Sequence, residues 1–252
     1  MAKKQFKAET KRLMDLMINS IYTHKEIFLR EIVSNASDAI DKMNYHAMTD
    51  PSSGLSRDDF RIDVSTDEEA RTITVSDNGV GMTAKDMEKN LGMIAYSDSF
   101  DFKSGLDENA DSEVIGQFGV GFYSAFMVSD KVTVISKAFG EEEASMWESE
   151  GIDGYTIKKA KRESVGTDII MHIKEDTEDE NYSEFLNIDR LRELVVNYSN
   201  YIRWPIYMDV ESGKWEETGE KGRRRGTEDR IRHIHGKQTD QQHGSHLAKK
   251  QR

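Results

Sequence analysis

Four polar side chains recur along one side of a helix-forming stretch, residues 29–42, which reads LREIVSNASDAIDK. At about 100° per residue they form a narrow stripe of Glu31, Asn35, Asp38 and Lys42, opposite an apolar side of Leu29, Val33, Ala36 and Ile40. Taken alone, such a stripe is usually a solvated surface. Asn and Asp are poor helix formers, however, because their side chains compete for the backbone, so their presence needs a reason.

Two glycine-rich segments could complete a ligand site with this stripe. SDNGVGM, residues 76–82, places Asp77 at the end of an expected strand, and its glycines let a ligand approach the backbone closely. GQFGVGF, residues 116–122, precedes an apolar run, and amides at a glycine-rich helix start can cradle phosphate. It is neither the P-loop nor the G-x-G-x-x-G dinucleotide fingerprint. Each segment alone is more often an ordinary turn.

The three segments together favour a nucleotide site. An Asn oxygen on a helix can bind Mg²⁺, a hard cation that takes few protein oxygens together with phosphates and water. A Glu one turn earlier can hold a water molecule near the terminal phosphate. A strand-end Asp can accept a hydrogen bond from an exocyclic amine, and a glycine loop can close over phosphates.

The composition limits the class of protein. The chain has 252 residues, of which 36% are hydrophobic and 33% charged, so a core is feasible under a heavily charged surface. No apolar run reaches the length of a membrane span, and the start has no apolar stretch that could act as a secretory signal. The absence of Cys excludes disulfides and thiolate metal sites. The net charge of −12 disfavours general nucleic-acid binding.

The charge is concentrated unevenly and suggests two regions. Residues 218–252 hold 10 Lys and Arg against 4 Asp and Glu, a net +6, which leaves −18 for residues 1–217. The 218–252 segment has almost no apolar residues and no periodicity. We therefore expect a disordered basic tail, which need not be native sequence, after a folded domain spanning 1–217.

The pattern within residues 1–217 predicts an α+β fold. Helical spacing covers 9–22, about 25–48 and about 188–203, and Thr83 is an expected cap of a short helix. Alternating apolar residues predict strands at FRIDVST, RTITVSDNG, KVTVIS, ASMWES, GYTIKKA and GTDIIMHI, and the last helix leads through Pro205 into IYMDV. The polar, glycine-containing residues 92–121 are expected to form a long mobile loop, of the kind that often serves as a lid.

Three of these segments, KEIFLREIVSNASDAIDK, SDNGVGM and IGQFGVGFYSAF, resemble the ATP-binding motifs of the bacterial-type heat-shock protein 90 chaperones. That family belongs to a wider group with the DNA gyrase ATPases, the mismatch-repair protein MutL and sensor histidine kinases. The resemblance covers about residues 5–212, with GTDIIMHIKE and YSNYIRWPIYM as later matches. It implies a two-layer α/β sandwich, a mostly antiparallel sheet covered by helices on one face, with a mobile ATP lid between Gly92 and Gly121.

The resemblance also implies a role for each motif residue. Glu31 is the general base that activates the attacking water, Asn35 is the Mg²⁺ ligand, and Asp38 and Lys42 line the polar edge of the pocket. Asp77 recognises the adenine amino group, directly and through a water that Thr167 also holds. The remaining nucleotide-binding positions are Gly81 and Met82 at the adenine, Asn90 and Phe122 at the ribose and phosphates, and Gly116, Gln117, Phe118, Gly119, Val120 and Gly121 at the phosphates.

The reaction implied is Mg²⁺-dependent hydrolysis of ATP to ADP that drives lid closure and conformational change in a chaperone. In the family, a following domain supplies an Arg to the γ-phosphate and a last domain holds the dimer. We expect this chain to lack both, and therefore to be a monomeric, weakly hydrolysing N-terminal domain. The expected partners are those missing middle and dimerisation domains and client proteins, in the cytoplasm, with neither nucleic acid nor membrane.

Three alternatives remain open from the residues. A histidine kinase needs a phosphoacceptor His and a dimerisation helix upstream, and only His24 precedes Asn35. A DNA-remodelling ATPase is disfavoured by the acidic folded part. A non-hydrolysing ATP-binding adaptor is suggested by two departures in the lid, because the family commonly has Ala-Lys-Ser-Gly-Thr where this chain has Ala-Tyr-Ser-Asp-Ser, residues 95–99.

The departures in the lid lead to a test. Tyr96 replaces a Lys that can reach the phosphates, and Asp98 places an anion beside an anionic ligand. Tyr96→Lys combined with Asp98→Gly should therefore strengthen binding of ATP more than binding of ADP, as measured by calorimetric titration. An equal gain for both nucleotides would show that the two residues do not act on the terminal phosphate.

Overall fold

The computed structural model describes residues 24–50, 54–92, 121–211 and 229–234. Its elements follow the chain as α2 (Ile27–Thr49), η3 (Arg57–Asp59), β1 (Ile62–Asp67), β2 (Thr72–Asp77), α3 (Ala84–Asn90), η4 (Gly121–Met127), β3 (Ser129–Lys137), β4 (Ala144–Ser149), β5 (Tyr155–Ala160), β6 (Gly166–Ile173), η5 (Tyr182–Leu186), α5 (Ile188–Tyr198), β7 (Ile206–Glu211) and β8 (Asp229–Ile234). The three η elements are 3-10 helices.

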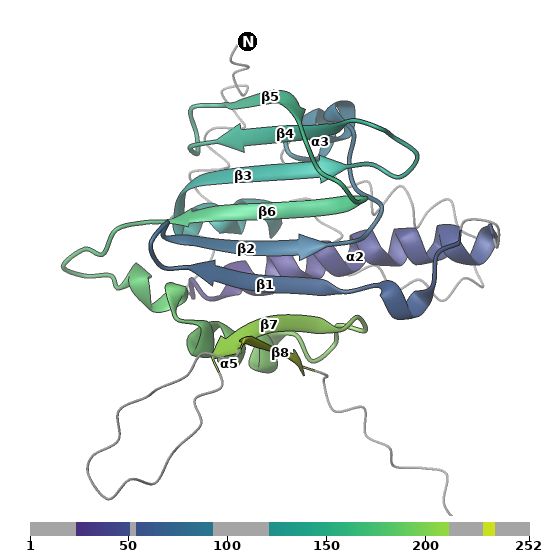
Figure 1. Ribbon diagram of the computed structural model, residues 1–252. Helices are drawn as coiled ribbons and strands as arrows, with labels where there is room; N and C mark the ends of the chain where they lie inside the picture. Colours follow the sequence, from purple (N-terminus) through teal and green to yellow (C-terminus); the bar gives the residue numbers. More distant parts are fainter. Residues whose placement is uncertain (1–23, 51–53, 93–120, 212–228, 235–252) are drawn as a thin grey trace, which may run out of the picture.

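The strands form one twisted sheet in the order β5-β4-β3-β6-β2-β1-β7-β8. Neighbouring strands run antiparallel except β1 and β7, which are parallel. Helices α2 and α3 lie behind the sheet in the view of Figure 1, and α5 packs against α2 and β7. The predicted α+β class, a mostly antiparallel sheet with helices over one face, is confirmed.

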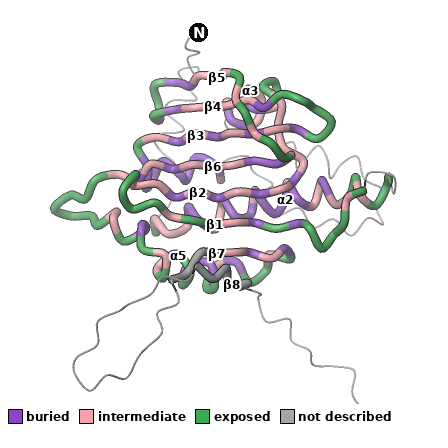
Figure 2. Tube along the Cα trace, viewed as in Figure 1, coloured by how far each residue is buried: buried purple, intermediate pink, exposed green. Residues whose placement is uncertain are grey.

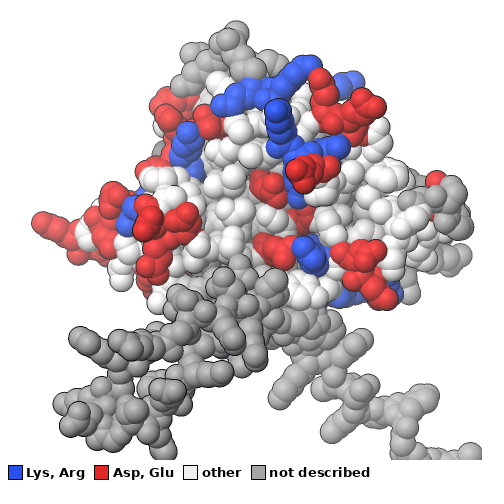
Figure 3. All heavy atoms as spheres, in the orientation of Figure 1, with Lys and Arg blue, Asp and Glu red and all other residues white. Residues whose placement is uncertain are grey.

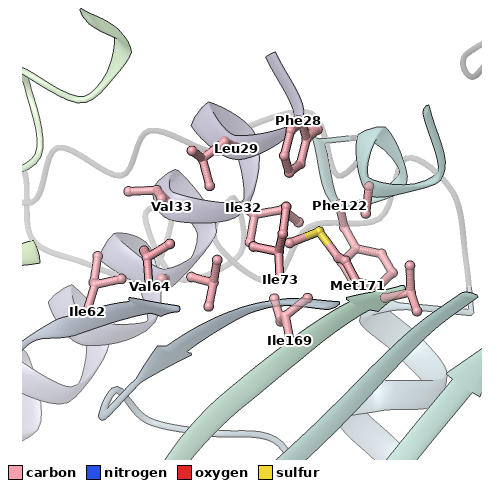
Figure 4. Close-up of a cluster of buried hydrophobic side chains, with 14 of the residues drawn as sticks. Phe28, Leu29, Ile32, Val33, Ile62, Val64, Ile73, Phe122, Ile169 and Met171 are labelled. Carbon is pink, nitrogen blue, oxygen red and sulfur yellow. The ribbon is translucent and has the colours of Figure 1, made fainter. Parts of the chain in front are cut away.

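The core forms between α2 and the inner face of the sheet. Along β2 every second residue is buried, and Figure 2 shows the same alternation of buried and half-buried residues on the neighbouring strands. Figure 4 shows the apolar side of α2, with Phe28 and Ile32, resting on strand residues that include Ile73 and Met171. All four side chains are fully buried. Period-2 strands and a period-3.6 helix therefore bury one common set of side chains.

Several local predictions hold and one boundary is wrong. Thr83 caps α3 through a capping box, in which its hydroxyl accepts from the Asp86 amide and the Asp86 carboxylate accepts from the Thr83 amide. The last helix ends at Tyr198, not near 203, because the polar Ser-Asn that follows favours leaving the helix. The helix predicted at 9–22 lies outside the described residues.

The end of the sheet next to β7 bears on the predicted tail. Residues 229–234 fall within the segment for which the sequence predicts disorder, yet they form β8, which pairs antiparallel with β7. The rest of 218–252 lies outside the described residues, so a domain boundary at 217 stays a prediction.

The outer face of the sheet has no helical cover in the part of the chain that Figure 1 draws in colour. Figure 3 shows uncharged side chains across much of this face, and acidic side chains gathered where the 174–184 loop projects. None of the described helices is long and apolar enough to cross a membrane.

Truncation after Glu217 tests the domain boundary. It removes β8, which lies at the edge of the sheet, away from the helix-covered core, and we expect the melting temperature and the affinity for ADP to stay nearly unchanged. Differential scanning fluorimetry and calorimetric titration would check this. A fall of more than about 2–4 °C, which corresponds to roughly 1 kcal/mol for a domain of this size, would place β8 in the folded unit.

Candidate functional site

Three polar residues end the core-facing rows of three adjacent strands. Asp77 of β2 stands opposite Thr167 of β6, and Thr167 stands opposite Ser136 of β3. Their exposed fractions are 5%, 4% and 0%. Each lies two residues beyond an apolar core residue on its strand, so the alternation that fills the core also places these side chains on the same face. The core therefore has a polar end.

Hydrogen bonds join this polar end to the glycine-rich loop. The Ser136 hydroxyl donates to the Gly166 carbonyl at 2.9 Å, lies 2.8 Å from the Thr167 hydroxyl, and accepts from the Met82 amide at 2.8 Å. Sequence reasoning missed Ser136. The available signal was its place at the end of the alternating run VTVIS, in register with the buried valines.

Burial dominates the electrostatics of Asp77. Removal from water raises the pKa of its carboxyl group from 3.8 to about 7. The Gly79 amide, which donates to Oδ1 at 2.8 Å, acts in the opposite direction, as do the Arg162 guanidinium and the Thr167 amide. Among the described residues, no cation directly contacts the Asp77 carboxylate oxygens. A buried carboxylate of this kind is suited to accept a hydrogen bond from a ligand.

The loop after Asp77 is wedged between α2 and β3. The Val80 amide donates to Ala39 of α2 at 3.0 Å, and the Val80 carbonyl accepts from the Phe139 amide at 2.8 Å. A Cβ on Gly79 would lie 2.5 Å from the Ala39 backbone, and Gly81, with φ +67°, would drive one into the Lys137 carbonyl. These glycines are therefore needed for close backbone packing, whether or not a ligand also approaches them.

The α2 stripe is covered and not a solvated surface. Asp38 is buried, and Glu31, Asn35 and Lys42 are half-buried. The 3-10 helix η4 packs against α2 and meets it at Glu31. The Glu31 carboxylate accepts through Oε1 from Arg30, at 2.6 Å from Nη2 and 3.1 Å from Nε. Its Oε2 faces Gly121, where a Cβ would lie only 2.5 Å away. Glu31 and Gly121, far apart in sequence, are thus brought together.

Asn35 offers a half-buried amide to a ligand. Its side chain makes no hydrogen bond with any described residue, although it lies one helical turn from Glu31. The described ranges contain no cluster of three or more acidic or His side chains that could cage a metal. A single amide oxygen fits Mg²⁺, which is commonly held by one or two protein oxygens plus phosphates.

The other predicted positions fall at the two ends of the expected lid. Asn90 ends α3, and Phe122 in η4 meets Trp147 of β4 edge to face at 5.4 Å. The Leu91 carbonyl accepts from the Tyr123 hydroxyl at 3.1 Å, which ties the end of α3 to η4. Gly116, Gln117, Phe118, Gly119 and Val120, together with Tyr96 and Asp98, lie outside the described residues.

Helix α2 connects the two groups of side chains. It packs on β2, which ends at Asp77, and on η4, which begins at Gly121 beside Glu31. The sheet is covered by helices on one face, a buried carboxylate ends one of its strands, and the covering helix carries an Asn. These features together define a class of ATPases with this sheet fold.

The chain belongs to that family: residues 22–178 match the model described as histidine kinase-, DNA gyrase B-, and HSP90-like ATPase. It carries an ATPase domain, and the resemblance shown by its motifs is confirmed. It is 56% identical over 220 residues to chaperone protein HtpG of Bacillus licheniformis, which is 87% of this chain and 35% of that protein. Identity to chaperone protein HtpG of Bacillus subtilis is 57% over 220 residues, again 87% and 35%. The chain thus spans about a third of the length of these relatives.

The raised pKa of Asp77 predicts a pH-dependent cost in stability. Between pH 3.8 and about 7 the folded protein holds a proton that the unfolded chain has lost, so stability falls as the pH rises through this window. Above pH 7 the loss in free energy of unfolding is on the order of 4 kcal/mol, because the pKa shift of about three units corresponds to 1.36 kcal/mol per unit. Asp77→Asn removes the charge and keeps the shape.

We therefore expect nucleotide-free Asp77→Asn to be more stable than the parent at pH 8, by about 1–3 kcal/mol after imperfect amide hydrogen bonding is allowed for. At pH 4 the two proteins should differ little. Urea unfolding at both pH values is the measurement. Equal destabilisation at both would show that Asp77 is a structural carboxylate that is better charged.

Proposed function

We propose that this chain is the N-terminal nucleotide-binding domain of an HtpG-type chaperone, which binds ATP and ADP with Mg²⁺ and hydrolyses ATP slowly. The observation that carries the proposal is the buried Asp77 carboxylate, in register with Thr167, beneath a helix that presents Glu31 and Asn35. The nucleotide state would drive conformational change in a longer cytoplasmic protein whose further domains and client proteins are its partners.

Adenine recognition is assigned to the polar end of the core. The Asp77 carboxylate accepts from the exocyclic amine, and the Thr167 hydroxyl holds a water molecule between the base and Asp77. The backbone at Gly81 and Met82 lies against the base, and its position is supported by the bond from the Met82 amide to Ser136. Ionised Asp77 is an acceptor only, which selects a ligand edge that donates.

Hydrolysis is assigned to Glu31. Arg30 occupies Oε1 of its carboxylate, while Oε2 faces Gly121, and Oε2 is the oxygen placed to take a proton from the attacking water. Asn35 would hold Mg²⁺, and when bound the ion neutralises charge on the phosphates. Asp38 and Lys42 line the polar edge next to this group.

The phosphate side is assigned to residues around the ends of the lid: Asn90, Phe122 and the run Gly116–Gly121, with lid closure over the ligand. The rate of the domain alone is expected to be low, because a cationic group at the transferring phosphoryl is worth orders of magnitude, and in the family a following domain supplies it.

Binding and hydrolysis should separate between Asp77 and Glu31. Loss of a charge-assisted hydrogen bond costs roughly 1.5–3 kcal/mol, so Asp77→Asn should weaken ADP binding about 10- to 150-fold in calorimetric titration. Glu31→Ala should bind ATP about as well as the parent and lose about 10²- to 10⁴-fold in hydrolysis. Asp63→Asn, on an exposed carboxylate of β1, is the control and should change neither.

Phosphate release is best measured in a chain extended by the domains that the relatives carry, so that the parent rate is high enough to compare. Should Glu31→Ala weaken ADP binding as severely as Asp77→Asn, Glu31 is a binding or structural residue and the base is assigned wrongly.

A further inference from the structure

We propose that Arg162 is a positioning residue for Asp77, which fixes the Asp77 backbone from the outer side of the sheet and keeps its carboxylate in the form that accepts a hydrogen bond from the base. This inference rests on the proposed function, since it assigns the nucleotide contact to Asp77. Neither the motifs nor the family match points to Arg162, which lies 85 residues from Asp77 in sequence.

The guanidinium of Arg162 is almost enclosed and makes contacts on three sides. Its side chain is 11% exposed. It donates two hydrogen bonds to the Asp168 carboxylate, from Nε to Oδ2 at 3.0 Å and from Nη2 to Oδ1 at 3.1 Å. Nη2 also donates to the Asp77 carbonyl at 3.1 Å, and Nη1 donates to the Ser164 carbonyl at 2.5 Å. A fork of this geometry is specific to Arg, because a Lys ammonium cannot bridge these acceptors in a plane.

These contacts hold the turn before β6 against the end of β2. Gly166 adopts φ +125° and passes so close to the Asp77 carbonyl that any side chain there would collide with it. Asp168 points to the face opposite Thr167, since neighbouring strand residues alternate. Arg162 therefore reaches Asp77 from behind the strand and leaves the side where a ligand would lie clear.

Arg162 and Asp168 act on the Asp77 carboxylate with opposite signs. The positive charge of Arg162 lowers the pKa of Asp77 and the negative charge of Asp168 raises it, against the larger raising effect of burial. With the resulting pKa at about 7, Asp77 is poised at neutral pH, where a small change in either neighbour alters the ionised fraction. Binding that requires the ionised form is strong above this pKa and weakens below it.

Other charged groups sit on the elements packed against β2 and stay unchanged in the variants below. They include Asp38, Asp41 and Lys42 on α2, Arg61 and Asp63 at β1, His172 on β6 and Glu184 on η5, and Lys137 lies one strand further away on β3. Arg203, which pairs with Asp41 at 3.6 Å, offers a matched control, because its substitution removes one Arg charge elsewhere.

The first experiment measures the titration of the Asp77 carboxyl group in the nucleotide-free protein. The carboxyl carbon resonance that disappears in Asp77→Asn is titrated by ¹³C NMR. Arg162→Met should move its midpoint up from about 7, and Asp168→Asn should move it down. Arg162→Lys, which keeps the charge, should stay close to the parent, and Arg203→Met should leave the midpoint unchanged.

The second experiment measures ADP affinity with Mg²⁺ from pH 6 to 9. At pH 7, Arg162→Met should bind about fivefold more weakly, the effect of a rise of about one pH unit, at the lower end for a lost opposite charge. The deficit should shrink toward the parent value at pH 9, where Asp77 is ionised in both. Asp168→Asn should bind more tightly than the parent at pH 7.

The two substitutions should change ADP affinity in opposite directions, and this distinguishes a positioning role of Arg162 from a purely structural one. If Arg162→Met and Asp168→Asn weaken ADP binding together and by a factor that does not change with pH, the pair is a structural brace and the proposal is overturned. An unchanged NMR midpoint in Arg162→Met overturns it as well, and this readout is available even where a variant is less stable.

Failure of the proposed function would look different. If Asp77→Asn binds ADP as well as the parent, Asp77 does not contact the base. The NMR titration would still show whether Arg162 changes the pKa of Asp77. If Asp77→Asn loses binding while the midpoint ignores Arg162, the nucleotide site stands and only this inference fails.

Discussion

The burial of one carboxylate, Asp77, governs the design of this domain. A charge removed from water is costly unless donors surround it. Here the Gly79 and Thr167 amides and the more distant Arg162 supply part of that compensation, and the carboxyl pKa still stands at about 7. The domain thus keeps an incompletely compensated acceptor at the end of its core, and such a group gains stability when a ligand donates to it.

Backbone contacts enclose this acceptor and tie the layers together. The loop carrying Gly79 and Gly81 touches α2 on one side and β3 on the other, and Gly166 crosses closely behind Asp77. Helix α2 is consequently covered on two sides, by the apolar inner face of the sheet and by η4 near Glu31. Its Asn and Asp are poor helix formers held in place by tertiary packing, so the helix can carry side chains chosen for chemistry.

The helices and most of the strands could be predicted from the sequence, because they depend on the spacing of residues that are close together in the chain. The 3.6-residue spacing located α2, alternation located six of the described strands, and Thr83 marked the start of α3. The motifs singled out Glu31, Asn35 and Asp77 together, and the family match agrees with the class that they indicated. The burial of the polar stripe was foreshadowed by Asn35 and Asp38, whose low helix propensity had no local explanation.

What joins the elements was decided only in three dimensions. The parallel pairing of β1 with β7 links segments more than a hundred residues apart, and no local pattern encodes it. Ser136 and Arg162 each look ordinary in sequence, one a strand-end Ser and the other a surface Arg in a charged turn. They matter because the registers of β3, β6 and β2 set Ser136, Thr167 and Asp77 side by side. The sequence by itself determined which residue types could do the chemistry, since that depends on composition and short-range periodicity. The tertiary structure decided which partners support them, because burial and long-range register arise only when distant segments pack.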